Sequence, residues 1–317
     1  MSAHEVVEER VEGLDCFVLV SHACDLRVGF APQAGMVGYS LRHRGDELLG
    51  QRGGLSAYRE RGSSFGIPLL HPWANRLSGR SYSASGRQVV LDPEVSPLRL
   101  EANGLPIHGL LAASPYWQLE GRSASAGRAA IGARFDFAAH PELLAAFPFP
   151  HQLHLEAELA TDTLTMATTL VATGDVSVPV CFGWHPYLRL PELPRERWSV
   201  ELAVLTRAEL DERAIPTGRE QPADAPPGRI GARGYDDLFT ALAEPACFAL
   251  EGGGRRIELE FEEGYPVAQV YAPPQERFIC FEPMTAPTDA LVSGRGLRTV
   301  APGDTFRAAF RLRVLAP

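Results

Sequence analysis

The sequence predicts an all-β fold in the form of a large antiparallel β-sandwich. Apolar residues recur with a period of two rather than 3.6 along most of the chain. Short alternating segments follow one another with no regular helix between them, which favours antiparallel pairing over crossover units. Glycine and proline number 30 and 26 of the 317 residues, and such turn-forming residues suit a chain that reverses direction often.

The predicted strands follow from that alternation. In segment 151–159, for example, Leu153, Leu155 and Leu159 share one face, while polar residues occupy the other. The predicted strands lie within residues 87–91, 116–121, 131–137, 151–159, 163–170, 198–204, 255–261, 267–272, 277–282 and 305–315. One short helix is predicted over residues 140–147, and a long loop rich in proline and glycine over Thr206–Gly234.

No break in composition divides the chain, so we expect one β-sandwich domain over residues 1–317. Residues 1–12 are acidic and are expected to form a loosely ordered N-terminal tail. They lack the cationic and apolar regions of a signal peptide, and no stretch approaches 18 apolar residues. We therefore expect a cytoplasmic protein that does not associate with membranes.

Charge and residue usage exclude several classes of function. The net charge is −9, which argues against a nucleic-acid partner because such proteins need a basic face. The chain contains no lysine, which excludes Schiff-base chemistry, a pyridoxal-phosphate anchor and a Walker-type phosphate loop. The five cysteines are far apart and form no CxxC pair, so neither a disulfide framework nor a zinc site is predicted.

Three ionisable residues stand at positions where strands are predicted to end. His108 lies between Pro106 and Gly109, and His185 directly follows the apolar run 178–184. Glu282 follows the apolar run 278–281, where a carboxylate is costly unless it is paired or used. Such placements are common in concave binding sites. A packed core histidine and a structural ion pair remain the alternative interpretations.

Seven motifs together give the chain a family resemblance. They are, in order, GIPLLHPWANRLSGRSY, GLPIHGLL, FPFPHQLHLEAEL, CFGWHPYLRL, ELDERAIPTG, GYDDLF and FEPMTAPTDAL, and they span roughly residues 65–292. In this order they resemble the aldose 1-epimerase (galactose mutarotase) family. The resemblance implies a galactose mutarotase-like supersandwich and an isomerase that interconverts the α and β anomers of an aldose without a cofactor or metal.

The resemblance also implies a set of site residues. Glu282 would act as the catalytic base and His185 as the acid. The implied substrate-binding residues are Arg76, His108 and Asp236, and Asn75 beside Arg76 is added to them. The rings of Trp73 and Tyr187 are expected to stack on the apolar faces of a sugar, with core packing as the alternative. Asp237 is adjacent to Asp236, and one sequence leaves the register between them open. Because a nearby carboxylate favours the imidazolium form, we expect Glu282 to keep His185 charged.

Three functions remain open at this stage. The leading hypothesis is a mutarotase acting on a free aldose, with a small-molecule sugar as its only expected partner and a monomer or homodimer as its state. The second is a glucose-6-phosphate (hexose-phosphate) 1-epimerase, which would need arginines converging at the site. Arg42, Arg44, Arg52 and Arg80 are available for this role, but we expect no such cluster. The third is a non-catalytic sugar-binding or regulatory module. Motif variants such as WHPYLRL leave the identity of the sugar open.

Overall fold

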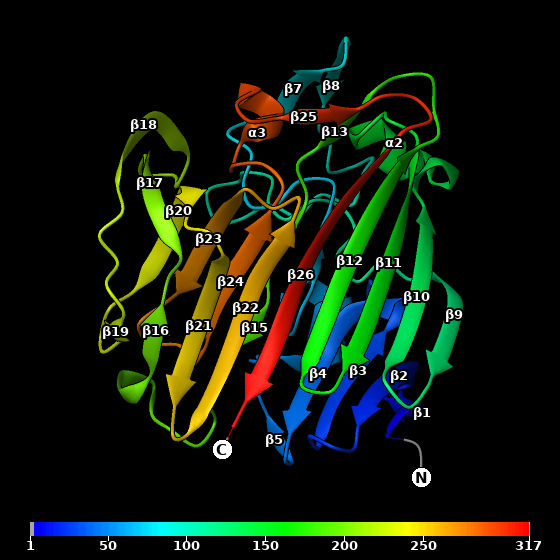
Figure 1. Cartoon of the computed structure of the whole chain (residues 1–317). Coiled ribbons are helices and arrows are strands. Elements are labelled where there is room, and N and C mark those ends of the chain that lie inside the picture. Colours follow the sequence, from blue (N-terminus) through cyan, green and yellow to red (C-terminus); the bar gives the residue numbers. More distant parts are fainter. Residues whose placement is uncertain (1–2, 317) are drawn as a thin grey trace.

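The computed structural model describes residues 3–316 and confirms the all-β prediction. Two large sheets pack face to face, and a smaller five-stranded sheet lies at one end of the molecule (Figure 1). All pairings between the named strands are antiparallel across the described range, as the registers show. The period-two alternation of the sequence therefore corresponds to sheets with one face turned toward a shared core.

The larger sheet has nine strands in the order β19-β16-β21-β22-β26-β12-β11-β10-β9. In β11, Leu153, Leu155 and Leu159 are fully buried, as the alternation predicts. The strands are β9 Gln118–Ala124, β10 Ala129–Asp136, β11 His151–Ala160, β12 Thr163–Ala172, β16 Ser199–Glu201, β19 Gly228–Arg229, β21 Ala246–Gly252, β22 Arg255–Glu263 and β26 Thr305–Leu315.

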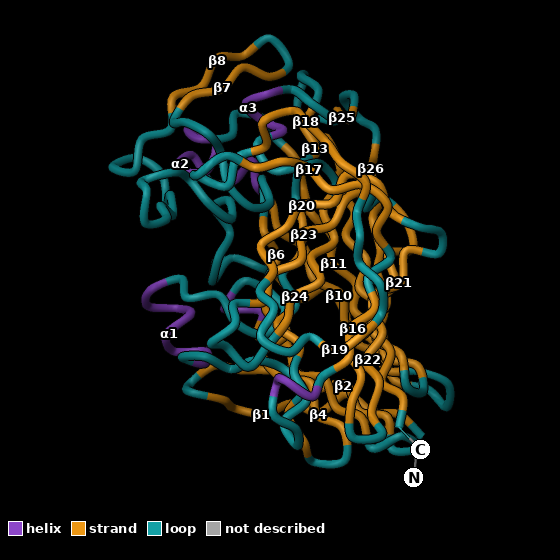
Figure 2. Tube along the Cα trace, turned by 90° about the vertical axis from the view of Figure 1, so that its left-hand side faces the viewer, coloured by secondary structure: helices purple, strands orange, loops and turns teal. Residues whose placement is uncertain are grey.

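The second sheet has eight strands, with β24 near its centre. Every residue of β24 is buried, because the nine-stranded sheet covers one face and loops cover the other (Figure 2). The strands are β6 Leu69–Leu70, β14 Gly183–Trp184, β15 Tyr187–Leu188, β17 Val204–Leu210, β18 Pro216–Pro222, β20 Tyr235–Leu242, β23 Val267–Ala272 and β24 Ile279–Met284.

Aromatic side chains join the two large sheets in the core. The ring of Trp184 packs edge-on against Phe310 of β26, with centroids 5.9 Å apart. Phe281 of β24 packs against Phe248 of β21 at 5.5 Å. These contacts pack the core-facing side of β24 and β14 tightly. The polar residues on the opposite side of these strands are therefore held by a rigid part of the sheet.

The expectation of a loose N-terminal tail over residues 1–12 is wrong for the described part of that segment. Residues His4–Val11 form β1, which pairs along its whole length with β2 (Leu14–Ser21). The strand lies at the edge of the five-stranded sheet, where charged residues are common because one side faces solvent. The other strands of this sheet are β3 Leu26–Ala31, β4 Val37–His43 and β5 Asp46–Glu47.

The expectation of a long loop over Thr206–Gly234 is also wrong. Most of β17 and all of β18 lie inside it and form a hairpin at the edge of the eight-stranded sheet. Proline is tolerated there because an edge strand leaves N–H positions unpaired. The segment was misassigned because prolines and glycines were taken to exclude a strand, although at an edge they do not.

Short elements complete the chain. The helix predicted over residues 140–147 is α2, Pro141–Ala146. The remaining elements are α1 Gly54–Arg61, α3 Ala290–Ser293, the strand pairs β7 Ser81–Ala84 with β8 Arg87–Val90 and β13 Val178–Val180 with β25 Arg298–Val300, and 3-10 turns at Pro32–Ala34, Phe137–Ala139 and Arg195–Arg197. Within residues 3–316, no helix is long and apolar enough to cross a membrane.

Candidate active site

A polar cavity of about 160 Å³ lies against the eight-stranded sheet. It gathers residues from loops and strands that are far apart in the sequence. Seven of the predicted site residues line it: Asn75, Arg76, His108, His185, Tyr187, Asp236 and Glu282. Six further lining residues were not predicted as site residues: Arg52, Ser64, Arg99, Ile107, Gln269 and Tyr271.

Three neighbouring strands supply the floor of the cavity. Glu282 of β24 is paired in register with Gln269 of β23, and Tyr271 of β23 with Asp236 of β20. The Gln269 amide nitrogen donates a hydrogen bond to Asp236 Oδ1 at 2.7 Å. Because strand register fixes which side chains are neighbours, the sheet itself holds Glu282 and its polar neighbours in place.

The junction between β14 and β15 delivers His185. Its backbone N–H donates to the carbonyl of Pro68 at 3.1 Å. Its ring stacks almost parallel on Tyr187, with centroids 4.4 Å apart and an interplanar angle of 6°. This leaves Nε2 of His185 at 3.2 Å from Oε1 of Glu282, with both residues almost fully buried. The two groups implied as acid and base therefore lie in direct contact.

Two residues of the cavity wall, Asn75 and His108, have left-handed backbone conformations. Asn75 has φ 53° and His108 has φ 62°. The N–H of His108 donates to the carbonyl of Asn75 at 2.9 Å, which joins the two loops. The next residue must be glycine, because a Cβ on Gly109 would lie 2.1 Å from the carbonyl oxygen of His71. Such strained positions concentrate at binding sites.

Burial decides the charge state of the acid–base pair. Desolvation, with a smaller contribution from Arg52 and Arg99, lowers the pKa of His185 to about 3. Desolvation also raises the pKa of Glu282 well above its ordinary value. Both shifts favour neutral groups, so the pair holds one proton at neutral pH and that proton rests mainly on the carboxyl. The expectation that Glu282 keeps His185 charged is therefore wrong.

Several buried polar atoms of the cavity have no hydrogen-bond partner among residues 3–316. They include Oε2 of Glu282, Oε1 of Gln269 and Nδ1 of His108. Buried polar groups are normally satisfied, and leaving one unpaired costs about 1–3 kcal/mol. The cavity thus presents acceptors and a ring nitrogen to a ligand that carries hydroxyl groups.

The structure brings three arginines to the cavity, where we expected no such cluster. Arg76 lies 3.9 Å from Asp236. Arg52 and Arg99 have no carboxylate within ion-pair distance in the described part of the chain, and they bind Ser64 instead. The sequence did not reveal the cluster, because Arg52 and Arg99 lie in loops with no pattern that marks their direction.

Two further points of the prediction are resolved by the geometry. Asp236 lines the cavity, whereas Asp237 lies on the other side of β20 and pairs with Arg207 at 3.0 Å. Trp73, expected to stack on a sugar, does not line the cavity and is buried in the core with 1% of its surface exposed. The aromatic rings at the cavity are those of Tyr187 and Tyr271.

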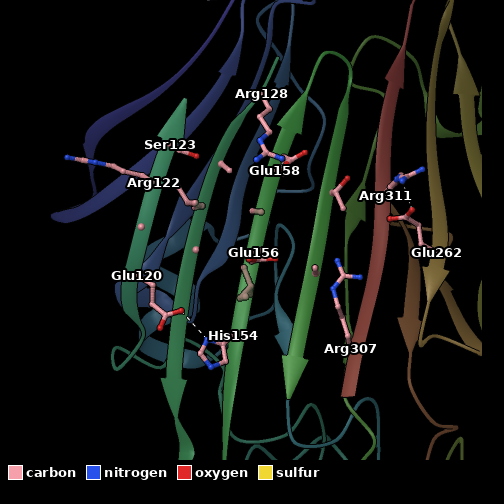
Figure 3. Close-up of a pocket in the computed structure, with 18 of the residues that line it drawn as sticks. Glu120, Arg122, Ser123, Arg128, His154, Glu156, Glu158, Glu262, Arg307 and Arg311 are labelled. Carbon is pink, nitrogen blue, oxygen red and sulfur yellow. Dashed lines mark hydrogen bonds and ion pairs between the residues drawn. The ribbon is translucent and has the colours of Figure 1, made fainter. Parts of the chain in front are cut away.

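A larger hollow of about 1050 Å³ lies elsewhere, on the polar face of the nine-stranded sheet (Figure 3). Most of its charged side chains are already paired, as in Arg128 with Glu158 at 2.8 Å and His154 with Glu120 at 3.0 Å. Because most of its charges are compensated, the smaller cavity is the better candidate for catalysis. Within residues 3–316, no group of three or more histidine, cysteine or acidic residues is placed to hold a metal ion.

Comparison with known proteins shows the family of the chain. The family model described as aldose 1-epimerase matches residues 36–313. The chain belongs to the aldose 1-epimerase family. This is a family of isomerases that act on sugars.

The chain resembles one curated protein in sequence and several solved structures in fold. The chain is 27% identical to the uncharacterized protein YphB of Escherichia coli K12, over 78% of this chain and 83% of that protein. A galactose mutarotase-like protein from Clostridium acetobutylicum superimposes with a TM-score of 0.85 at 17% identity, covering 99% of each chain. Galactose 1-epimerase from Lactobacillus acidophilus NCFM superimposes at 0.77 with 16% identity, covering 100% of this chain and 99% of the other.

Proposed function

We propose that the protein is an aldose 1-epimerase that interconverts the α and β anomers of an aldopyranose. The observation that carries the proposal is the direct contact between His185 Nε2 and Glu282 Oε1 at 3.2 Å, inside a cavity with unpaired polar atoms. Anomer exchange requires one group that removes a proton and another that supplies one, and this cavity holds both within reach of a single small substrate.

The proposed reaction opens and recloses the hemiacetal. Glu282 takes the proton from the anomeric hydroxyl while His185 gives a proton to the ring oxygen. The bond between the anomeric carbon and the ring oxygen breaks, and the open chain carries an aldehyde. After rotation about the bond between carbons 1 and 2, the hydroxyl formed from the ring oxygen attacks the other face of the aldehyde. His185 then takes its proton back and Glu282 returns one to the new anomeric oxygen.

The single proton held by the pair suits this cycle. In one form the proton is on the Glu282 carboxyl, and in the other it is on the His185 ring. The two forms interconvert when that proton moves across the 3.2 Å between Oε1 and Nε2, so no proton is taken up from solvent. The working form, carboxylate with imidazolium, is therefore accessible at constant charge. We expect a broad activity plateau, limited on the acid side by protonation of the whole pair and on the alkaline side by loss of its last proton.

Two features of the cavity bear on the choice among the three functions that the sequence left open. The intact pair of Glu282 and His185 disfavours a module that only binds sugar, because such a module needs neither group. Arg52 and Arg99, which have no carboxylate partner among the described residues, favour the hexose-phosphate version over an epimerase of uncharged aldoses. Arg76 and Asp236 would hold the sugar hydroxyls.

The test is the rate of anomer exchange, measured by polarimetry or by NMR exchange between the two anomeric protons. The panel contains glucose, galactose, other aldoses and glucose 6-phosphate. We expect exchange above the buffer rate with at least one of them, and a loss of about 10²- to 10⁴-fold in Glu282→Gln. Asp237→Asn is the matched control, since this residue pairs outside the cavity. Exchange at the parent rate in Glu282→Gln would refute the proposal.

A further inference from the structure

The loop that carries Arg76 has no strand of its own to hold it. Residues 75–78 lie between β6 and β7 and belong to neither. On one side they join a second loop: the N–H of Leu77 donates to the carbonyl of Pro106 at 2.9 Å, and Arg76 forms an isolated antiparallel bridge with Ile107. The direction of the Arg76 side chain therefore depends on the few backbone hydrogen bonds that fix this loop.

Asp289 holds the other side of the same loop. Its backbone N–H donates to the carbonyl of Arg76 at 3.0 Å, and its Oδ1 accepts a hydrogen bond from the backbone N–H of Ser78 at 2.6 Å. The two bonds fix the loop at Arg76 and again at Ser78. Asp289 is buried, with 8% of its surface exposed, so water competes little for these bonds.

The conformation of Asp289 departs from what its position in the chain favours. It immediately precedes α3, where an aspartate normally has an extended backbone and caps the helix with its side chain. Here φ is 68°, which is uncommon for a residue other than glycine, and the side chain makes no capping bond to the helix. The carboxylate bonds to Ser78 instead. A residue that gives up a local preference for a distant contact is typical of a functional site.

The segment after β24 connects this loop to the acid–base pair. Asp289 follows Glu282 in that segment, and between them both the N–H and the hydroxyl of Thr285 donate to the carbonyl of Phe182, at 2.9 and 3.0 Å. Phe182 directly precedes β14, which leads to His185. One segment is therefore bonded both to the chain that delivers the histidine and to the loop that carries the arginine.

We propose that Asp289 is a positioning residue, which holds residues 75–78 so that the Arg76 guanidinium faces the cavity. This role rests on the proposed epimerase function, and Asp289 itself does not line the cavity. Arg76 Nη1 donates to Asn75 Oδ1 at 3.1 Å, and Nη2 lies 3.9 Å from Asp236 Oδ2. Both contacts depend on where the loop backbone stands, and a misplacement of about 1 Å at such a group weakens catalysis.

The experiment compares anomer exchange in Asp289→Gly and Asp289→Asn, using whichever of glucose, galactose and glucose 6-phosphate the parent exchanges fastest. Glycine adopts a left-handed φ without steric cost but lacks the acceptor, whereas asparagine keeps an acceptor oxygen and tolerates this φ. We expect Asp289→Gly to raise KM by about tenfold and to lower kcat less, and Asp289→Asn to stay within about threefold of the parent. An unchanged KM in Asp289→Gly overturns the inference. Asp289→Ala, which also lacks the acceptor, replaces the glycine variant if that variant does not fold.

Asp136→Gly is the matched control. Asp136 Oδ1 accepts a hydrogen bond from the backbone N–H of Ala138 at 3.1 Å, and Asp136 does not line the cavity. This variant also loses a bond between a carboxylate and a loop N–H, so it should lower the urea midpoint but leave KM within about twofold of the parent. A tenfold rise of KM in both glycine variants indicates a general loosening of the fold and overturns the inference.

A double-mutant cycle shows whether Asp289 acts through Arg76. Asp289→Gly should lower kcat/KM by about tenfold in the parent but by less than about twofold in Arg76→Ala, because the group to be positioned is then absent. A residue that only stabilises the fold causes the same loss in both backgrounds, and that result overturns the inference.

Crystal structures of the variants separate this inference from the proposed function. If the parent exchanges no sugar, the epimerase proposal fails, and the position of Arg76 is then judged without turnover. An Arg76 guanidinium displaced from Asp236 by more than about 1 Å in Asp289→Gly, but not in Asp289→Asn, supports the positioning role. An Arg76 side chain that superimposes on that of the parent in both variants overturns it.

Discussion

Two pairs of histidines are in contact within residues 3–316, and one of them belongs to the candidate active site. His71 and His151 face each other in the core, with their Nε2 atoms 2.8 Å apart. His108 and His185 meet edge-on at the cavity, with ring centroids 5.3 Å apart. Desolvation lowers the pKa of His151 to about 4 and that of His185 to about 3. A strongly shifted pKa therefore does not by itself distinguish the two pairs.

The surroundings distinguish them. Phe137 and Phe147 enclose the His71–His151 pair, and Nδ1 of His151 lies 2.6 Å from the carbonyl oxygen of Phe149. The polar ring atoms of the core pair mainly find their hydrogen-bond partners within the pair and the adjacent backbone. His185 instead contacts Glu282 at the edge of a cavity that also contains unpaired polar atoms. A buried histidine is a catalytic candidate when a second titratable group and space for a ligand accompany it.

The sharpest test of this comparison applies one substitution to each pair. We expect His185→Asn to reduce kcat/KM for anomer exchange by about 10²- to 10⁴-fold with little change in stability. His71→Asn should leave exchange per folded molecule within about threefold, but destabilise the fold by about 1–3 kcal/mol because His151 loses its partner. Exchange rates and urea unfolding measure the two effects. Equal losses of activity would place both pairs in the mechanism.

The contribution of Glu282 to stability should depend on pH with the opposite sign to that of a core histidine. Because the folded pKa of Glu282 is raised, the folded state binds more protons than the unfolded state above about pH 4.3, and stability falls as pH rises. Glu282→Gln removes this cost. We expect the variant to be about 1–3 kcal/mol more stable than the parent at pH 8 and similar to it at pH 4. A constant difference in urea unfolding across this range would contradict the expectation.

For the core pair of His71 and His151, the pH dependence of stability has the opposite sign. The folded pKa values of His71 and His151 are lowered, so the unfolded state binds more protons below about pH 6.5 and stability is lost as pH falls toward 4. His151→Leu alone should cost about 1–3 kcal/mol, because it leaves His71 unpaired. The double change with His71→Leu should recover part of that loss and flatten the acid side of the stability curve. A double-mutant cycle by urea unfolding between pH 5 and 8 measures both effects.

The smallest effect concerns two adjacent aspartates. Asp236 lines the cavity and accepts a hydrogen bond from Gln269 at 2.7 Å, whereas Asp237 pairs with Arg207. We expect Asp236→Asn to raise KM by about tenfold, the effect of weakening one polar contact to the substrate. Asp237→Asn should leave KM within about twofold. Steady-state kinetics on the preferred sugar test this, and the reverse order would show that β20 presents its other face to the substrate.

Many of the strands could be predicted from the sequence because side-chain alternation is a local property. The predicted segment 305–315 has the same bounds as β26, and the predicted helix over 140–147 differs from α2 by one residue at each end. The prediction failed where charge or proline content was taken as evidence against a strand, as in His4–Val11 and β18. Both lie at sheet edges, where such residues are tolerated.

Some residues of the candidate site could be singled out from the sequence, and others could not. Glu282 and His185 were found because a carboxylate and an imidazole at the ends of apolar runs are conspicuous, and because the surrounding motifs resemble a known family. Gln269 and Tyr271 were missed, since within the alternating segment 267–272 neither is unusual. Only the pairing of Gln269 with Glu282 across β23 and β24 brings it to the cavity.

The sequence alone determined the all-β class and the absence of lysine chemistry, because these follow from residue type and short-range periodicity. The roles of Glu282 and His185 as base and acid were implied by the family resemblance and stay a prediction. The tertiary structure decided what depends on distance and solvent. It buried Trp73 in the core, joined Arg52 to Arg99 through Ser64 and placed the proton of the pair mainly on Glu282. Contacts between distant segments and the loss of water at a buried group are properties of the assembled fold, so no local pattern encodes them.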